Sequence, residues 1–137
     1  MAQNKTSATD ADVGAYILSR AKGQQAADAR ELMAMFQALV GEPPMMWGPS
    51  IVGFGSYRYR YESGRSGEAP LIGFAIRGRE IVVYLDCVES EAPLLAALGT
   101  HRVGKSCLYF RQLADLDIPV LEQLVSRSID GLRRRHG

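Results

Sequence analysis

The sequence predicts an α+β fold, in which a mainly antiparallel sheet of about five strands packs against helices. Apolar residues recur at three- and four-residue steps near both ends of the chain and alternate with polar residues in its middle. The 137 residues, 47% hydrophobic and 23% charged, suit one globular domain. We therefore expect a single domain over residues 1–137, with two N-terminal helices, one long C-terminal helix and a flexible start at residues 1–9.

Two helices are expected before the sheet. Thr9 is a candidate N-cap for the first, which has Val13, Tyr16 and Ile17 on one side. The second is expected over residues 24–40, where apolar residues follow the helical spacing, and Gly41 supplies its stop. Its apolar positions are Ala29, Leu32, Met33, Phe36, Leu39 and Val40.

Four antiparallel strands are expected next. The pattern changes to period two at residues 50–54 and 56–62, and the largely apolar strands at residues 71–77 and 80–86 follow. Residues 62–70, rich in Gly and Ser, are expected to form a turn, and Gly78 with Arg79 suits a two-residue hairpin. In the second strand, tyrosines occupy one face while Arg58 and Arg60 occupy the other.

The last third of the chain predicts a short helix, a fifth strand and a long helix. Ser90 is expected to start the short helix and Gly99 to end it, and residues 107–111 are apolar enough for a strand. Asp117 is a candidate N-cap of the long amphipathic helix, whose basic end suits the helix dipole. Its inward residues are Ile118, Leu121, Leu124, Val125, Ile129 and Leu132.

The segment GTHRVGKS, residues 99–106, matches the phosphate-binding loop of nucleotide hydrolases. That loop needs a strand before it and a helix after it, so that helix N–H groups face the phosphates. Here the expected order is helix, loop, strand, which is the reverse. We therefore expect no nucleotide hydrolase, although Lys105 could still contact a ligand.

Two long motifs together resemble the YdhG-like family, a group of small bacterial domains of unknown function. They are MWGPSIVGFGSYRYRYESGR, residues 46–65, and LGTHRVGKSCLYFRQLADLD, residues 98–117, and the resemblance extends to about residue 132. It implies a soluble, cytoplasmic α+β domain with no agreed activity, although some relatives have been likened to frataxin, an iron chaperone. The sequence lacks the family's tryptophan near Ala69 and keeps only Arg77 of its Ser-Pro-Arg-Lys run.

Six residues form the candidate ligand-binding surface. Arginine offers a planar fork of donors for a carboxylate or phosphate, and neighbouring strands could bring further cations beside the arginines at 58 and 60. An outer face with carboxylate partners is the alternative. Trp47 could wall a pocket or pack on the core. The six residues are Trp47, Arg58, Tyr59, Arg60, Arg77 and Lys105.

The first functional hypothesis is a binding module for an anionic small molecule or a protein segment. The alternative is a frataxin-like iron-binding chaperone that uses acidic residues of the first two helices, namely Asp10, Asp12, Asp28 and Glu31. An enzyme is the third, although no convergent acid, base and nucleophile are visible. Self-association into a homo-oligomer stays open.

The composition argues against some classes of binding partner. The net charge of +1 and the short apolar runs favour neither nucleic acid nor a membrane as partner. Cys87 and Cys107 lack any zinc-ligand spacing, and no cofactor motif is present, so we expect two free thiols in a reducing cytoplasm and no cofactor.

Overall fold

The computed structural model describes residues 8–60, 63–86 and 90–136, and it confirms the α+β class. A seven-stranded antiparallel sheet has the order β1-β2-β3-β6-β7-β9-β8, and β4 and β5 form a separate two-stranded sheet. The large sheet comprises β1 (Ala8–Thr9), β2 (Pro44–Trp47), β3 (Ile51–Phe54), β6 (Ile72–Arg77), β7 (Glu80–Tyr84), β8 (Arg102–Val103) and β9 (Cys107–Phe110). The small one comprises β4 (Tyr57–Arg60) and β5 (Ser66–Ala69).

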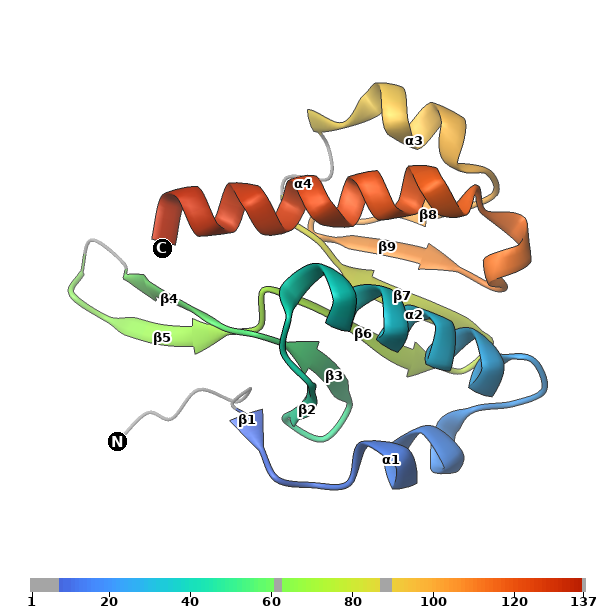
Figure 1. Cartoon of the computed structure of the whole chain (residues 1–137), viewed down its shortest axis with the longest axis horizontal. Coiled ribbons are helices and arrows are strands. Elements are labelled where there is room, and N and C mark those ends of the chain that lie inside the picture. The colour runs from blue at the N-terminus through green and yellow to red at the C-terminus, as the bar shows by residue number, and fades with distance from the viewer. Residues whose placement is uncertain (1–7, 61–62, 87–89, 137) are drawn as a thin grey trace.

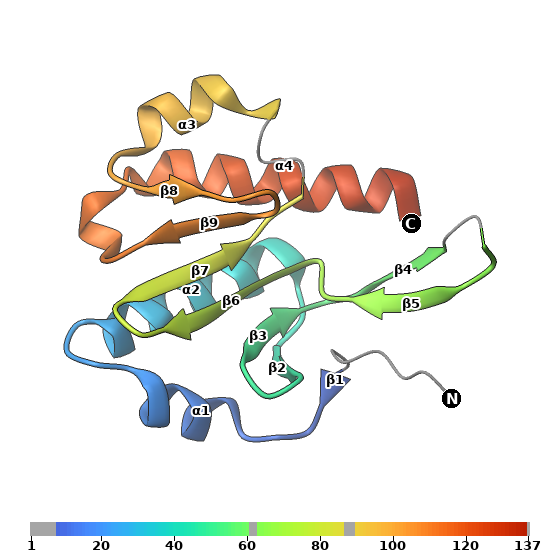
Figure 2. The same ribbon diagram turned by 180° about the vertical axis from the view of Figure 1, so that it is seen from behind.

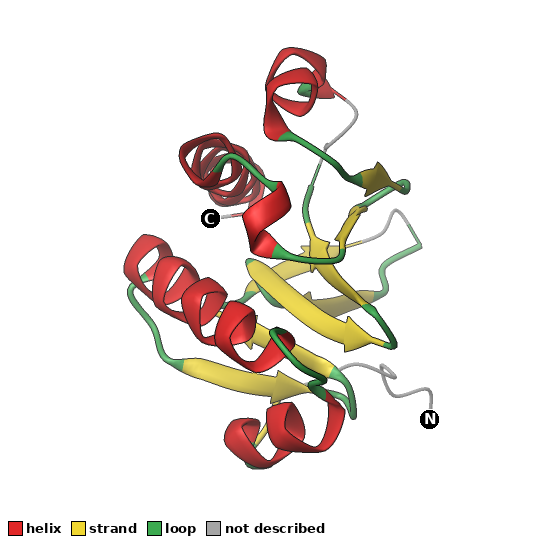
Figure 3. Ribbon diagram, turned by 90° about the vertical axis from the view of Figure 1, so that its right-hand side faces the viewer, coloured by secondary structure: helices red, strands yellow, loops and turns green. Residues whose placement is uncertain are grey.

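Helices cover one face of the large sheet. They are α1 (Val13–Arg20), α2 (Gln25–Val40), α3 (Ala92–Leu98) and α4 (Ile118–His136), with a 3-10 turn, η2 (Leu113–Asp115), before α4. α2 and α4 lie side by side on this face (Figures 1 and 3), while the opposite face is turned toward the viewer in Figure 2. We call that opposite face the outer face. No helix of the described residues is long and apolar enough to cross a membrane.

The core lies between the sheet and α2 and α4. Alternate residues of the strands point into it, and Phe36 of α2 packs edge-on against Phe54 and Phe74, with ring centroids 5.7 and 6.2 Å apart. α4 contributes five of the six residues that its periodicity predicts to face inward, namely Leu121, Leu124, Val125, Ile129 and Leu132. The prediction is wrong for Ile118, which lies in the first turn of α4 and is 37% exposed. The intervening strand residues, such as Ala75 and Val82, are buried on the outer face.

Several predicted helix ends are confirmed and two are wrong. Gly41 ends α2 in the left-handed conformation, and Asp117 accepts a hydrogen bond from the Val120 N–H at the start of α4. α1 is capped by Asp12 rather than by Thr9, because its Oδ1 accepts from the Ala15 N–H. α3 begins after Glu91, not Ser90.

The sheet differs from the expected one in how its strands pair. β3 pairs directly with β6, so the strand of tyrosines and arginines does not lie between them. It pairs instead with β5, four residues that the sequence predicts to be part of a turn. Three short strands, β1, β2 and β8, were not predicted. Tyr61 and Glu62, expected to extend the strand, lie outside the described residues.

A buried tyrosine joins α1 to the sheet. The Tyr16 hydroxyl donates to the Ser50 carbonyl at 2.7 Å and accepts from the Ile76 N–H at 3.0 Å. The β3–β6 register, with Val52 opposite Phe74, would place these two groups opposite each other. The hydroxyl therefore continues the hydrogen-bond ladder beyond the end of β3.

We expect Tyr16→Phe to lower the free energy of unfolding by about 1–3 kcal/mol, because the buried Ile76 N–H loses its partner. Urea denaturation measures this change, and the denaturant slope should stay constant. Tyr109→Phe is the control, since no hydrogen bond of the Tyr109 hydroxyl is found within the described residues. Equal stabilities of the two variants would contradict the role of the Tyr16 hydroxyl.

Candidate functional site

The six residues predicted to form a ligand-binding surface lie on several elements of the structure. Arg58, Tyr59 and Arg60 stand on the β4–β5 hairpin, which projects beyond the large sheet (Figure 1). Both arginines are exposed, whereas Tyr57 and Tyr59 are half-buried, and Tyr57 packs on His136 of α4 at 4.8 Å between ring centroids. These two tyrosines form the inner face, as expected. β4 pairs only with β5, so the strand that carries Arg77 is not paired with the strand of these arginines.

Trp47 is a packed residue at the end of β2. Its side chain lies on the outer face and is only 4% exposed. A Cβ placed on Gly53 would lie 2.8 Å from Nε1 of Trp47 and 2.7 Å from Cβ of Pro70, so the indole fills the space that this glycine leaves. Of the two sequence-based interpretations, the packing role is the one that this burial supports.

Arg77 belongs to the outer face of the large sheet. Its guanidinium donates to the Tyr84 hydroxyl at 2.8 Å. Ala75 and Val82, which share this face, are at most 1% exposed. Burial raises the pKa of the Tyr84 hydroxyl, and the guanidinium of Arg77 opposes this effect, so the phenol stays neutral at physiological pH.

Lys105 lies in the turn between β8 and β9, within the segment that matches a phosphate-binding loop. That segment starts at Gly99, the C-cap of α3, and leads into β8 and then β9. The predicted order of helix, loop and strand is confirmed. No helix begins after Ser106 to direct its N–H groups at a phosphate, because residues 107–110 form β9.

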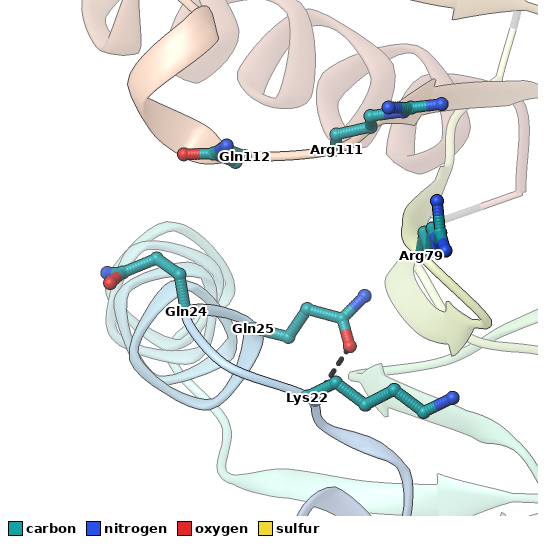
Figure 4. Close-up of a pocket in the computed structure, with 6 residues that line it drawn as sticks. All are labelled: Lys22, Gln24, Gln25, Arg79, Arg111 and Gln112. Carbon is teal, nitrogen blue, oxygen red and sulfur yellow. Dashed lines mark hydrogen bonds between the residues drawn. The ribbon is translucent and has the colours of Figure 1, made fainter.

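A basic pocket lies at the end of the large sheet opposite the β8–β9 turn, where four segments of the chain meet (Figure 4). It has a volume of about 280 Å³. Lys22, Arg79 and Arg111 extend toward one end of it, and the amides of Gln24 and Gln112 lie at the other. Its lining residues are Lys22, Gln24, Gln25, Arg79, Arg111 and Gln112.

Two buried polar residues at the start of α2 hold the walls of the basic pocket in place. Gln25, 5% exposed, accepts from the Lys22 N–H at 2.8 Å and donates to the Gly78 carbonyl at 3.0 Å. Asp28, 4% exposed, accepts from the Leu113 N–H at 3.1 Å. These bonds tie the α1–α2 loop, the β6–β7 turn and the segment after β9 to one helix end, and each of the three carries one cation of the pocket.

The charge of the basic pocket is unbalanced. All three cations are exposed, and none forms an ion pair with a carboxylate of the described chain. Glu80, the residue after Arg79, is bound to Arg102 at 2.7 Å, and Arg102 lies over the Tyr109 ring at 3.9 Å. No acidic residue of the described chain lines the pocket, and the nearby carboxylate of Asp28, which Gln24 contacts, gives one negative charge against three positive charges, so the balance suits an anion.

Two of the four acidic residues considered for iron are used within the fold. Asp12 caps α1 and Asp28 accepts from Leu113, so neither belongs to an open acidic ridge. Among residues 8–60, 63–86 and 90–136, no three His, Cys, Asp or Glu side chains gather closely enough to hold a metal ion. Cys107 is half-buried in β9, and Cys87 lies outside the described residues.

The fold and this pocket define the protein as a small α+β protein with a basic pocket beside a helix N-terminus. Comparisons with models of protein families, with curated proteins and with solved structures found no match. Membership of the YdhG-like family therefore stays a prediction from the two motifs.

Proposed function

We propose that this protein is a binding module for a small, multiply charged anion, such as a phosphate ester, held in the basic pocket. The observation that carries the proposal is that Lys22, Arg79 and Arg111 line one hollow whose described lining contains no acidic residue. Two guanidinium groups and an ammonium group are the usual partners of phosphate oxygens. A dianion would be favoured over a single carboxylate by the threefold positive charge.

The buried hydrogen bonds of Gln25 and Asp28 support this function. They fix the backbone segments that carry the cations, so less conformational entropy is lost when a ligand binds. The cations themselves are exposed, and salt screens exposed charges over about 8 Å at physiological ionic strength. Binding is therefore expected to weaken as salt is added.

We propose the basic pocket, rather than the six-residue surface, as the ligand-binding site, because its three cations line one hollow. An iron-binding chaperone has no observation in its favour, since two of its four acidic candidates, Asp12 and Asp28, serve as a helix cap and a buried acceptor. Membership of the YdhG-like family is compatible with the α+β fold and stays part of the proposal.

The test is a thermal-shift panel at low salt with inorganic phosphate, phosphorylated metabolites, small carboxylates and nucleotides with magnesium. A ligand at about a hundred times its dissociation constant adds roughly 2.7 kcal/mol to the free energy of unfolding. The double variant Arg79→Gln/Arg111→Gln should bind the stabilising anion at least about tenfold more weakly, because each charge-assisted hydrogen bond contributes about 1.5–3 kcal/mol.

Arg58→Gln/Arg60→Gln is the matched control, because it removes the same charge from exposed arginines of the hairpin. It should bind like the unmodified protein. Loss of binding in the hairpin variant alone would move the site to the hairpin. A panel in which no anion raises the midpoint would end the proposal.

A further inference from the structure

A groove runs between α2 and α4 on the side of the helix layer that faces away from the sheet. Two adjoining hollows form it, with volumes of about 410 and 330 Å³, and they share Leu39, Ile118 and Glu122. α2 and α4 lie side by side here (Figures 1 and 3). We call this feature the helix groove. Its lining residues are Glu31, Met35, Ala38, Leu39, Leu113, Ile118, Pro119, Glu122, Gln123 and Ser126.

The two walls of the helix groove are single helix faces of equal length. Residues 31, 35, 38 and 39 of α2 recur at steps of three and four, and residues 118, 122 and 126 of α4 recur at steps of four. Each wall spans nine residues of helix, whose eight steps of 1.5 Å give a length of about 12 Å. This length matches two turns of a bound helix or a short extended segment.

The floor of the helix groove is apolar and partly open to solvent. Ile118 is 37% exposed, which makes it one of few large apolar side chains left in water by the described residues. Met35 and Leu39 are half-buried beside it, and Leu113 at one end belongs to the core. Apolar surface of this kind, with polar residues at its edges, is typical of a protein-interaction site.

Each wall of the helix groove carries one carboxylate. Glu31 stands on α2 and Glu122 on α4, and neither forms an ion pair with a described residue. Arg133 of α4 donates to the carbonyl of Val40, the last residue of α2. The groove is therefore lined by apolar side chains, by the polar side chains of Gln123 and Ser126, and by two carboxylates with no ion-pair partner among the described residues.

We propose that the helix groove docks a short amphipathic segment of a protein partner, with apolar residues on one side and Lys or Arg at both margins. The apolar residues would cover Leu39 and Ile118, and the basic residues would pair with Glu31 and Glu122. Charge complementarity selects this partner over an acidic segment, because like charges across an interface oppose association. This inference concerns a different surface from the anion pocket and does not depend on it.

The test uses two synthetic helical peptides of 14 residues that share one apolar pattern of leucines, one with lysines at the polar positions and one with glutamates. Fluorescence anisotropy measures their binding to the full chain. The lysine peptide should bind, and the glutamate peptide should bind at least about tenfold more weakly. Failure of the lysine peptide to bind would overturn the proposal.

Charge reversal locates the site. Glu31→Lys/Glu122→Lys should reverse the preference, so that the glutamate peptide binds at least tenfold more tightly than the lysine peptide. Glu42→Lys/Glu68→Lys is the matched control, because it makes the same change in charge at two exposed residues outside the groove. A groove variant that still prefers the lysine peptide, or a control that also reverses, would overturn the assignment.

Discussion

Gly99→Ala is expected to destabilise the protein by about 4 kcal/mol or more, a large share of the 5–15 kcal/mol typical of a small domain. Gly99 has φ 114° and ψ −158°, a conformation that is essentially confined to glycine and costs other residues about 1–3 kcal/mol. In a chain of this size the midpoint of thermal unfolding should fall by roughly 15 °C.

Close packing of Gly99 against the backbone of another segment accounts for the rest of the expected destabilisation. A Cβ on Gly99 would overlap the Asp115 carbonyl oxygen and lie 3.2 Å from the carbonyl carbon of the same residue. These backbone atoms belong to the segment just before α4. Moving them apart would strain the hydrogen bonds from Thr100 N–H to the Asp115 carbonyl and from Asp117 N–H to the Leu98 carbonyl, at 3.2 and 2.7 Å.

Gly131→Ala is the control for this prediction. Gly131 lies within α4, and a Cβ there would meet nothing within 4 Å. Alanine should stabilise the helix by about 0.5–1 kcal/mol, because glycine is a poor helix former. A stability of Gly99→Ala within about 1 kcal/mol of the unmodified protein would show that the α3–α4 contact can relax. The expected loss would instead assign the first glycine of the GTHRVGKS segment a structural role.

Elements with a strong apolar period were predictable from the sequence. α2 and α4 follow three- and four-residue steps over several turns, and β6 and β7 are apolar runs joined by a glycine turn with φ 60°. Burial of one apolar stripe determines the two helices, and burial of both faces determines the two strands. Local pattern was therefore enough to place them.

Strand pairing was not predictable from the same pattern. Alternation of Tyr57, Arg58, Tyr59 and Arg60 shows that the segment is a strand, but a strand alternates in the same way within a large sheet and within a hairpin. The short edge strands β1 and β8 contain two residues each, too few for a period to be visible. The predicted arginine surface assumed that this strand pairs within the large sheet, and that pairing was wrong.

The basic pocket was missed because its cations come from three separate loops. No local motif joins Lys22, Arg79 and Arg111. One signal was present: Gln25 and Asp28 occupy the same helical stripe as the buried Leu32, and polar residues in a core stripe need buried partners. Those partners, the Gly78 carbonyl and the Leu113 N–H, lie beside two of the cations.

Asp28→Ala is expected to lower the free energy of unfolding by roughly 2–4 kcal/mol, because a buried N–H loses a charged acceptor and the N-terminal end of α2 loses a negative charge. The Leu113 N–H would have no replacement partner within the described structure. Asp28→Asn should lose only about 1 kcal/mol, since its amide oxygen can still accept that hydrogen bond. Urea denaturation separates the two variants, and equal losses would show that the charge, not the hydrogen bond, is what stabilises the fold.

The same pair of variants separates the fold from the proposed function. Gln24, which lines the basic pocket, donates to Asp28 at 3.5 Å, so the carboxylate lies close enough to repel a bound anion. If the pocket binds phosphate as proposed, Asp28→Asn should bind it severalfold more tightly although the fold is less stable. Asp28→Ala should bind it less tightly than Asp28→Asn, because the segment that begins at Leu113 is then no longer held. Phosphate titrations of both variants measure this order, and the reverse order would show that the buried hydrogen bond does not position the cations.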